Sequence, residues 1–196
     1  MTPAGPSPEG LRERRRRDTV RRIQDNALSL FGTRGFDAVT VEEVAVAAGV
    51  SPMTVYRHFG TKENLVLHDE LLAGLPEALA DRLGDGGDIR TATEELLRGL
   101  PGDADGEWER TARQRIRLVN EVPAVAGAAH IRARAAAADL VAAVLARGDA
   151  TPLEARVAVL ALLSALEAAC DHWYADAAGT SLRDVTIAAV RALRRP

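Results

Sequence analysis

Residues 40–60 read TVEEVAVAAGVSPMTVYRHFG, and this stretch predicts two short helices joined by a tight turn. Thr40, followed three residues later by Glu43, forms a capping box that can begin a helix of about two turns. Gly49 tolerates the left-handed backbone conformation that ends such a helix. Ser51 and Pro52 then supply an N-cap and a first helical residue for a second short helix. The stretch therefore predicts a helix-turn-helix, a pattern that an ordinary pair of packed helices in an all-α core would share.

The flanking sequence is also helical in its spacing. From Thr19 to Gly35, apolar residues fall at the i, i+4, i+7 and i+8 positions of one helical face. No segment alternates apolar and polar residues for long enough to predict a strand. Further helices are expected over residues 61–83 with a kink or break at Pro76, and over 88–100, 107–120, 123–147, 151–174 and 181–194. We therefore predict an all-α chain of about nine helices.

Composition limits the classes of protein that this chain can be. The chain has 196 residues, of which 47% are hydrophobic and 27% charged, which is typical of a folded globular protein. No apolar run is long enough to cross a membrane, and the first ten residues, rich in Pro and Gly, lack a signal-peptide core. The single cysteine, Cys170, excludes an internal disulfide framework and fits a reducing cytoplasm.

Charge is distributed unevenly along the chain. Residues 1–67 carry a formal charge of +2 and the remaining residues carry −5, although the whole chain is only −3. The positive excess lies in LRERRRRDTVRR, residues 11–22, with seven arginines against two acids. Such a segment is either a solvated helix start or a nucleic-acid contact. We expect a flexible basic tail over residues 1–17, a helix-turn-helix domain over 18–66, and a helical domain over 67–196.

Residues 23–66 read IQDNALSLFGTRGFDAVTVEEVAVAAGVSPMTVYRHFGTKENLV, and this run resembles the DNA-binding domain of the TetR family of bacterial transcription regulators. The likeness includes Leu-Phe near the end of the first helix, Ala-Gly-Val-Ser in the turn, and Tyr-x-His-Phe at the end of the third helix. It implies a three-helix DNA-binding domain followed by a larger helical domain that binds an effector and dimerises. It also implies a homodimeric repressor that binds a palindromic double-stranded operator and is released by a small molecule, without a cofactor or metal.

The resemblance and helix geometry together predict the DNA contacts. With Val55 and Phe59 turned inward, the start of the recognition helix should face base edges in the major groove. The resemblance assigns phosphate contacts to Tyr56, His58 and Lys62, the only lysine in the chain, and to backbone amides beside Thr40. Arg57 could reach a phosphate or a guanine, or pair with an acid, and the arginine cluster could lie along the backbone or in a minor groove. The predicted DNA-binding residues are Thr40, Ser51, Met53, Thr54, Tyr56, Arg57, His58, Lys62, Arg16 and Arg17.

The second domain carries weaker signals. The resemblance places an effector, expected to be largely apolar, among residues Leu75, Trp108, Ile116, Asn120 and His130. It places a dimer interface on the last two helices, at Val157, Leu160, Ser164, Trp173, Val185, Ala189 and Leu193, although these residues also fit an ordinary core. A regulator that has the same DNA-binding domain but no small-molecule ligand remains an alternative. An enzyme that uses Cys170 and His172 is another, but no elbow, glycine-rich loop or metal spacing accompanies that pair.

Overall fold

The computed structural model describes residues 8–69, 72, 74–84, 87–104, 106–175 and 179–193. Within these residues every regular element is an α-helix, and there are ten of them, which confirms the predicted all-α class. The chain divides into two compact units, Met1–His68 and Asp69–Pro196, compared with a predicted boundary between residues 66 and 67. In the part of the chain that the structure describes, no helix is long and apolar enough to cross a membrane.

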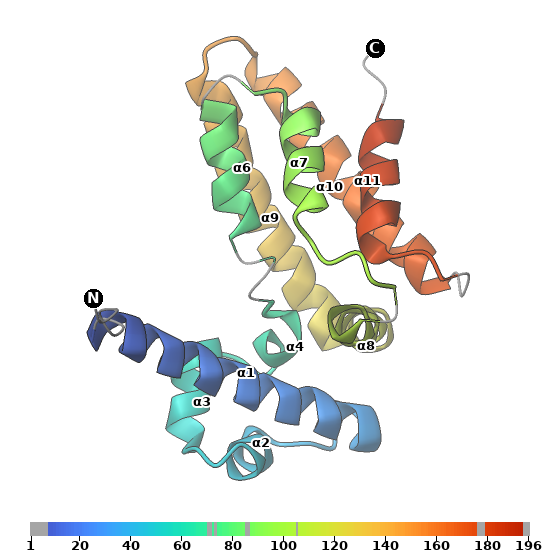
Figure 1. The fold of residues 1–196 in the computed structure, drawn as a ribbon. Coiled ribbons are helices and arrows are strands. Elements are labelled where there is room, and N and C mark those ends of the chain that lie inside the picture. Colours follow the sequence, from blue (N-terminus) through green and yellow to red (C-terminus); the bar gives the residue numbers. More distant parts are fainter. Residues whose placement is uncertain are drawn as a thin grey trace, which may run out of the picture. The chain divides into compact units, whose positions relative to one another are not determined.

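The first unit contains α1 (Pro8–Arg34), α2 (Val41–Ala47), α3 (Pro52–Phe59) and α4 (Asn64–Leu67), shown in blue to teal in Figure 1. The long helix α1 packs against α2 and α4, and α2 packs against α3. Ile23 and Phe31 of α1, Val44 of α2 and Val55 of α3 are almost completely buried. Gln24 of α1 is also buried, and its Nε2 donates to the carbonyls of Leu65 (3.1 Å) and His68, which ties α1 to α4.

Two predicted helix boundaries differ from those in the structure. Residues 8–17, expected to form part of a flexible tail, belong to α1, because proline is well tolerated in a first turn and arginine is a good helix former. Residues 1–7 of that predicted tail lie outside the described residues. The single helix expected over 61–83, with a kink or break at Pro76, is divided: α4 ends at Leu67, and α6 (Leu75–Gly84) begins one residue before Pro76, which lies in its first turn.

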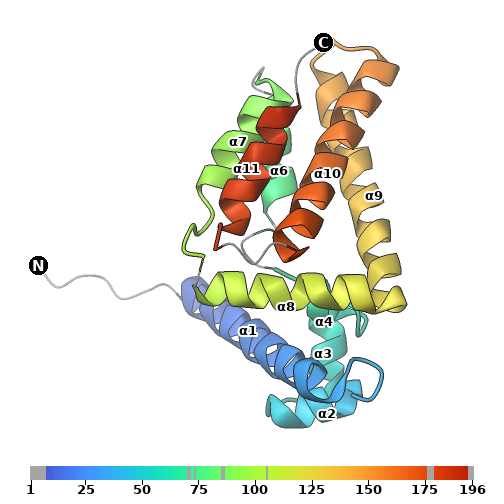
Figure 2. The same cartoon turned by 90° about the vertical axis from the view of Figure 1, so that its right-hand side faces the viewer.

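The second unit contains α6 together with α7 (Ile89–Arg98), α8 (Glu107–Glu121), α9 (Pro123–Ala146), α10 (Pro152–Ala175) and α11 (Leu182–Ala192). Figure 2 shows α6, α7, α9, α10 and α11 running roughly along one direction, whereas α8 crosses below them. The main core lies where α6, α7, α9, α10 and α11 meet and is built largely of Leu, Val and Ala. Thr151 and Glu154 form the second predicted capping box, and Ser181 caps α11 through its hydroxyl, 3.1 Å from the Asp184 amide.

A smaller core cluster joins α8 to α10 and α11. Ala112, Trp173 and Leu182 are its buried members, and Trp108 packs against it. Glu109 of α8 is 1% exposed, and its Oε1 accepts the Leu182 N–H at 2.8 Å, so an acid from one helix caps the start of another. Burial raises the pKa of Glu109, although this hydrogen bond and the Arg113 charge act in the opposite direction.

Candidate nucleic-acid interface

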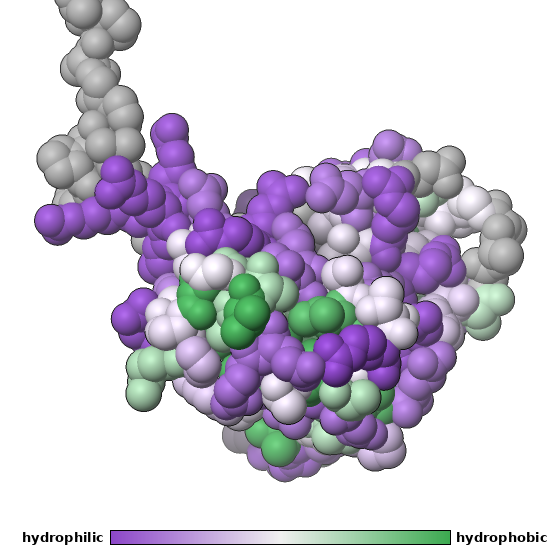
Figure 3. All heavy atoms as spheres, turned by 90° about the horizontal axis from the view of Figure 1, so that it is seen from below, coloured by the Kyte–Doolittle hydropathy of each residue, from purple (hydrophilic) through white to green (hydrophobic). Residues whose placement is uncertain are grey.

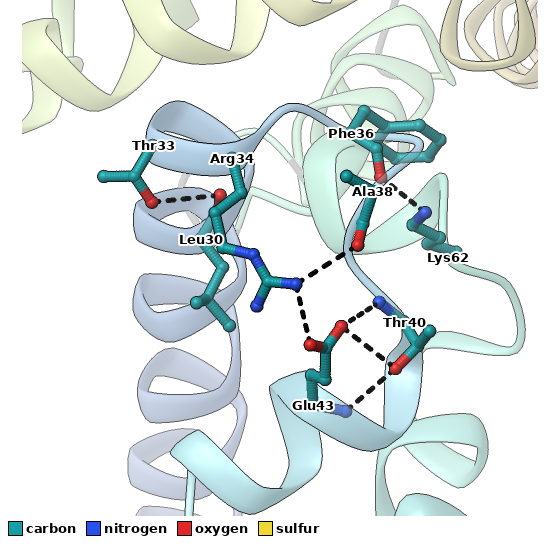
Figure 4. A network of polar contacts seen from close by, with 8 residues as sticks. All are labelled: Leu30, Thr33, Arg34, Phe36, Ala38, Thr40, Glu43 and Lys62. Atoms are coloured by element: carbon teal, nitrogen blue, oxygen red, sulfur yellow. Dashed lines mark hydrogen bonds and ion pairs between the residues drawn. The ribbon is translucent and has the colours of Figure 1, made fainter.

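The start of α2 is fixed by the predicted capping box. The Thr40 N–H donates to Glu43 Oε2 at 2.8 Å, and the Glu43 N–H donates to Thr40 Oγ1 at 3.2 Å. Arg34, in the last turn of α1, pairs with Glu43 Oε1 at 2.8 Å and also donates to the Ala38 carbonyl (Figure 4). These contacts, the Thr40 amide first and then Arg34, lower the pKa of Glu43. Thr40 is therefore engaged in the cap, which holds α2 against the end of α1.

The turn and α3 match the predicted helix-turn-helix in detail. Gly49 has φ of +64°, and the Val50 N–H donates to the Ala45 carbonyl at 2.9 Å, which closes the turn. Ser51 caps α3 by accepting the Thr54 N–H at 3.2 Å, with Pro52 at the first helical position. On α3 itself, Val55 is 1% and Phe59 5% exposed, as predicted. These two buried side chains fix α3 to its unit, so the opposite face of α3 points outward.

The outward face of α3 carries the residues expected to contact DNA. Met53 is 73% exposed and Tyr56 is 44% exposed. Ser51 and Arg57 are also exposed, and Thr54 and His58 are half-buried. Seen from below, the side that includes α2 and α3 is mostly hydrophilic, with small separate hydrophobic patches (Figure 3). Val46 of α2 was not among the predicted DNA-binding residues, but it is 81% exposed. An exposed apolar residue in this position is a candidate for contact with a base or sugar.

Lys62 makes contacts within the unit. Its ammonium donates to the Phe36 carbonyl at 2.5 Å (Figure 4). Nζ lies 4.2 Å from the centre of the Phe36 ring and 5.7 Å from that of Phe31. The side chain is half-buried. Lys62 therefore connects the turn after α3 with the loop after α1, a role that the resemblance to a phosphate-binding lysine did not suggest. An ammonium has three N–H groups, so this contact and a phosphate contact are compatible.

Arg16 and Arg17 are exposed near the start of α1. Burial first, then the charge of Arg57 and last that of Arg16, lowers the pKa of His58. Most of the predicted DNA-binding residues lie on or beside α3, and Thr40 lies at the start of α2.

The predicted effector residues do not come together. Leu75 lines an apolar cavity of about 110 Å³ between α6, α7, α9 and α10. Trp108 and Ile116 pack against the smaller core cluster instead, and Asn120 and His130 are exposed. The residues that line the cavity are Leu75, Pro76, Leu79, Thr93, Leu96, Leu97, Ala136, Leu140, Leu162, Leu163 and Leu166. The surface of the cavity is almost wholly hydrocarbon. The hydroxyl of Thr93 adds little polarity to it, because it donates to the Ile89 carbonyl.

The predicted dimer residues fall into three groups. Val157 is 58% and Leu160 49% exposed, and Ser164 is exposed on the same face of α10. Leu153, which was not predicted, extends this face and is 71% exposed. The assignment of Trp173 to the interface was wrong: it is 2% exposed, and its Nε1 donates to the Thr180 carbonyl within the unit. The remaining predicted residues, Val185, Ala189 and Leu193, are half-buried.

Cys170 and His172 do not form a catalytic pair in this structure. Cys170 packs against the smaller core cluster, and His172 is exposed. Burial, with the charges of Asp171 and Glu167, raises the pKa of Cys170 to about 11, so the thiol is protonated at neutral pH and is a poor nucleophile. Among the described residues, no group of three or more His, Cys, Asp or Glu side chains could hold a metal ion.

Comparisons with known proteins agree with this geometry. Residues 23–68 match a family model described as bacterial regulatory proteins of the tetR family, and residues 90–196 match the MftR C-terminal domain. The regulator TcmR of Streptomyces glaucescens is 37% identical over 101 residues, which cover 52% of this chain but only 41% of TcmR. MftR of Mycobacterium tuberculosis is 28% identical over 171 residues, or 83% of each chain. The solved structure of NalD, a repressor in Pseudomonas aeruginosa, shares the fold with a TM-score of 0.58 at 22% identity, covering 90% of this chain and 95% of NalD.

Proposed function

The chain belongs to the TetR family of DNA-binding transcription regulators, and on that premise we propose that it is a homodimeric repressor that a small apolar effector releases from a palindromic operator. It would act in the cytoplasm, where the operator lies. The observation that carries the proposal is the outward face of α3, where Met53 and Tyr56 project from a helix anchored by Val55 and Phe59. A helix so held can enter the major groove and read base edges with its first turn.

The direct test is a footprint on the DNA that flanks the chain's own coding region. We expect one protected site with two inverted half-sites whose centres lie about 34–36 Å apart, one turn of B-DNA. Protection of a single unrepeated half-site would contradict the dimeric model. A transcription assay on the same fragment then distinguishes a repressor from an activator, because only a repressor lowers transcription when it is added.

The exposed face of α10 supports dimerisation. Leu153, Val157 and Leu160 lie on one side of this helix, next to a groove that Ile89 of α7 and Leu193 also line. A contiguous apolar face of this kind indicates a partner surface, and a second copy would also supply the second recognition helix. Val157→Arg should convert the dimer to a monomer in sedimentation experiments and weaken operator binding. Ile131→Arg is the matched control, because Ile131 is 69% exposed on a different helix, α9; equal effects of both variants would contradict the assignment.

The cavity lined by Leu75 is the proposed effector site. Its hydrocarbon lining would favour an uncharged apolar molecule, because a buried charge without a partner is costly. A volume of about 110 Å³ is smaller than the cavities of roughly 300–1,000 Å³ that hold drug-sized ligands, so binding would have to widen it. Straight-chain alcohols of increasing length can serve as probes in an operator-release assay. Ala136→Leu, which fills the cavity, should abolish release while operator binding persists.

The small volume also favours a second candidate, a regulator of the same family that takes no small molecule and is controlled by a protein partner or acts constitutively. In that case neither the alcohols nor Ala136→Leu would change operator binding.

A further inference from the structure

A basic groove lies between α7 and α11 of the second unit, two helices that pack side by side (Figure 2). Its volume is about 550 Å³, within the range of roughly 300–1,000 Å³ that is typical of small-molecule pockets. None of its residues lines the apolar cavity beside Leu75 or the groove beside α10. The residues that line it are Arg98, Arg183, Asp184, Ile187, Ala188 and Arg191.

Helix periodicity explains how this lining is arranged. Arg183, Ile187 and Arg191 follow one another at i, i+4 and i+8, so they form one stripe along α11. Arg98, in the last turn of α7, lines the groove opposite that stripe. The stripe therefore has a charged residue at each end and an apolar residue between them, next to the methyl group of Ala188.

Two of the three guanidinium groups are held together by one carboxylate. Glu94 Oε1 accepts from Arg191 Nε at 2.9 Å and from Arg191 Nη2 at 2.5 Å, and it also accepts from Arg98 Nη2. The Glu94 side chain is only 17% exposed, whereas those of Arg98 and Arg191 are 55% and 58% exposed. Two positive charges thus meet one negative charge, which leaves an excess of +1 at this end of the groove.

The N–H groups of this pair are only partly used. Among the described residues, Glu94 is the only hydrogen-bond acceptor of Arg98 and of Arg191. A guanidinium carries further N–H donors in a planar fork, which matches the oxygens of a carboxylate or a phosphate. Because both arginines are more than half exposed, a ligand can reach these donors from solvent. A second anion beside Glu94 would neutralise the excess charge.

Arg183 is fixed at the other end of the groove. Its Nε donates to Asp184 Oδ1 at 3.0 Å. Its guanidinium lies over Gly102, because a Cβ built at that glycine would come within 2.0 Å of Arg183 Cζ. A side chain at position 102 would therefore displace Arg183. Since Asp184 offsets the charge of Arg183, the excess positive charge belongs to Arg98 and Arg191.

We propose that this groove binds an organic anion, a phosphate or carboxylate attached to a short hydrocarbon group, with its anionic head on Arg98 and Arg191 and its hydrocarbon over Ile187. Such a ligand does not suit the apolar cavity beside Leu75, because a buried charge without a partner is costly. The groove is therefore a binding site separate from the proposed effector site. Because α7 and α11 each supply one of the two guanidinium groups, a bound anion would bridge these helices.

The test measures binding of hexyl phosphate, hexanoate and inorganic phosphate to the full chain by isothermal titration calorimetry. We expect hexyl phosphate and hexanoate to bind at one site per chain, and the tighter of the two identifies the head group. Inorganic phosphate should bind about tenfold more weakly than hexyl phosphate, the difference that burial of about two methylene groups gives.

Variants locate the site. Arg98→Gln and Arg191→Gln should each weaken binding of hexyl phosphate about fivefold, the upper end for an exposed ion pair. Ala188→Glu places a negative charge at an exposed position of the groove and should weaken binding by more than about tenfold. Arg134→Gln is the matched control, because it removes the same charge from an exposed position of α9. Circular dichroism checks the fold, and Ala188→Glu decides if either arginine variant unfolds.

Three results would overturn the inference. Hexyl phosphate could fail to bind wild type, or Arg134→Gln could weaken binding as much as the groove variants do, and either result would exclude an anion site in the groove. Inorganic phosphate could bind as tightly as hexyl phosphate, which would exclude the contact between hydrocarbon and Ile187. The calorimetry uses no DNA, so its failure leaves the proposed function standing, and a failed footprint leaves this inference standing.

Discussion

Lys62→Met removes one charge from the turn between α3 and α4 and keeps an unbranched apolar side chain. The wild-type ammonium donates to the Phe36 carbonyl at 2.5 Å and lies 4.2 Å from the centre of the Phe36 ring. A hydrogen bond from a charged group contributes about 1.5–3 kcal/mol, and an exposed cation–π contact about 0.5–1 kcal/mol. Because Lys62 is only half-buried, we take the lower end of each range and expect a loss of about 2 kcal/mol of local stability.

Amide hydrogen exchange in the intact chain, followed by mass spectrometry, measures this loss where it occurs. A change of about 2 kcal/mol corresponds to exchange about 30-fold faster, since about 1.4 kcal/mol is tenfold. We expect this acceleration in peptides from residues 36–66 and no change in peptides from the second unit. Arg57→Met is the matched control, because it removes the same charge from an exposed position of α3.

The reasoning is refuted if Lys62→Met exchanges at the wild-type rate, or if it is accelerated no more than Arg57→Met. Either result would mean that the ammonium adds nothing to the packing of Phe36. A loss of operator affinity without faster exchange would assign Lys62 to phosphate contact alone.

Burial, followed by the charges of Arg57 and Arg16, lowers the pKa of His58 in the free protein. A bound phosphate would raise this pKa, so His58 should take up a proton when DNA binds. Operator affinity should therefore rise as pH falls from about 7.5 to about 6, and His58→Gln should flatten this dependence; an equal dependence in both proteins would exclude His58 as the cause. Burial raises the pKa of Glu109, so its folded state holds the proton more tightly than the unfolded state does. The free energy of unfolding in urea should then fall as pH rises from about 4 through the raised pKa, and a slope unchanged in Glu109→Gln would contradict this. Met53→Ala should alter base preference at one or two positions of each half-site in a panel of single-base operator variants; uniform weakening across the panel would argue against a base contact.

The local features of the helix-turn-helix were predictable from the sequence because each depends on residues close together in the chain. The Thr40 capping box spans three residues, and Gly49 and Ser51 act on their immediate neighbours. The carbonyl partner of Lys62 belongs to Phe36, 26 residues away, so no local pattern could indicate it. The sequence indicated the ion pair between Arg34 and Glu43 only weakly, through the position of the two residues on either side of the loop between α1 and α2.

The second unit was less predictable because core, cavity and interface there use the same aliphatic residues. Helix α10 carries apolar side chains on several faces, so periodicity alone did not separate buried Leu162 from exposed Leu160. Trp173 was assigned to an interface because the resemblance places one on the last two helices, but the loop after α10 places the Thr180 carbonyl within reach of its indole N–H. The extension of α1 to Pro8 was missed because a basic, Pro- and Gly-rich start resembles a tail in composition.

The placement of the two tryptophans has an optical consequence. Trp108 and Trp173 both lie in the second unit, and the Arg113 guanidinium sits 4.1 Å from the centre of the Trp173 ring. The unit that carries α3 has no tryptophan, so emission excited selectively at indole wavelengths originates entirely outside it. A change in that emission when operator DNA is added would therefore report communication from the DNA-contacting unit to the other one. The chain thus contains its own label for measuring how the two units are coupled.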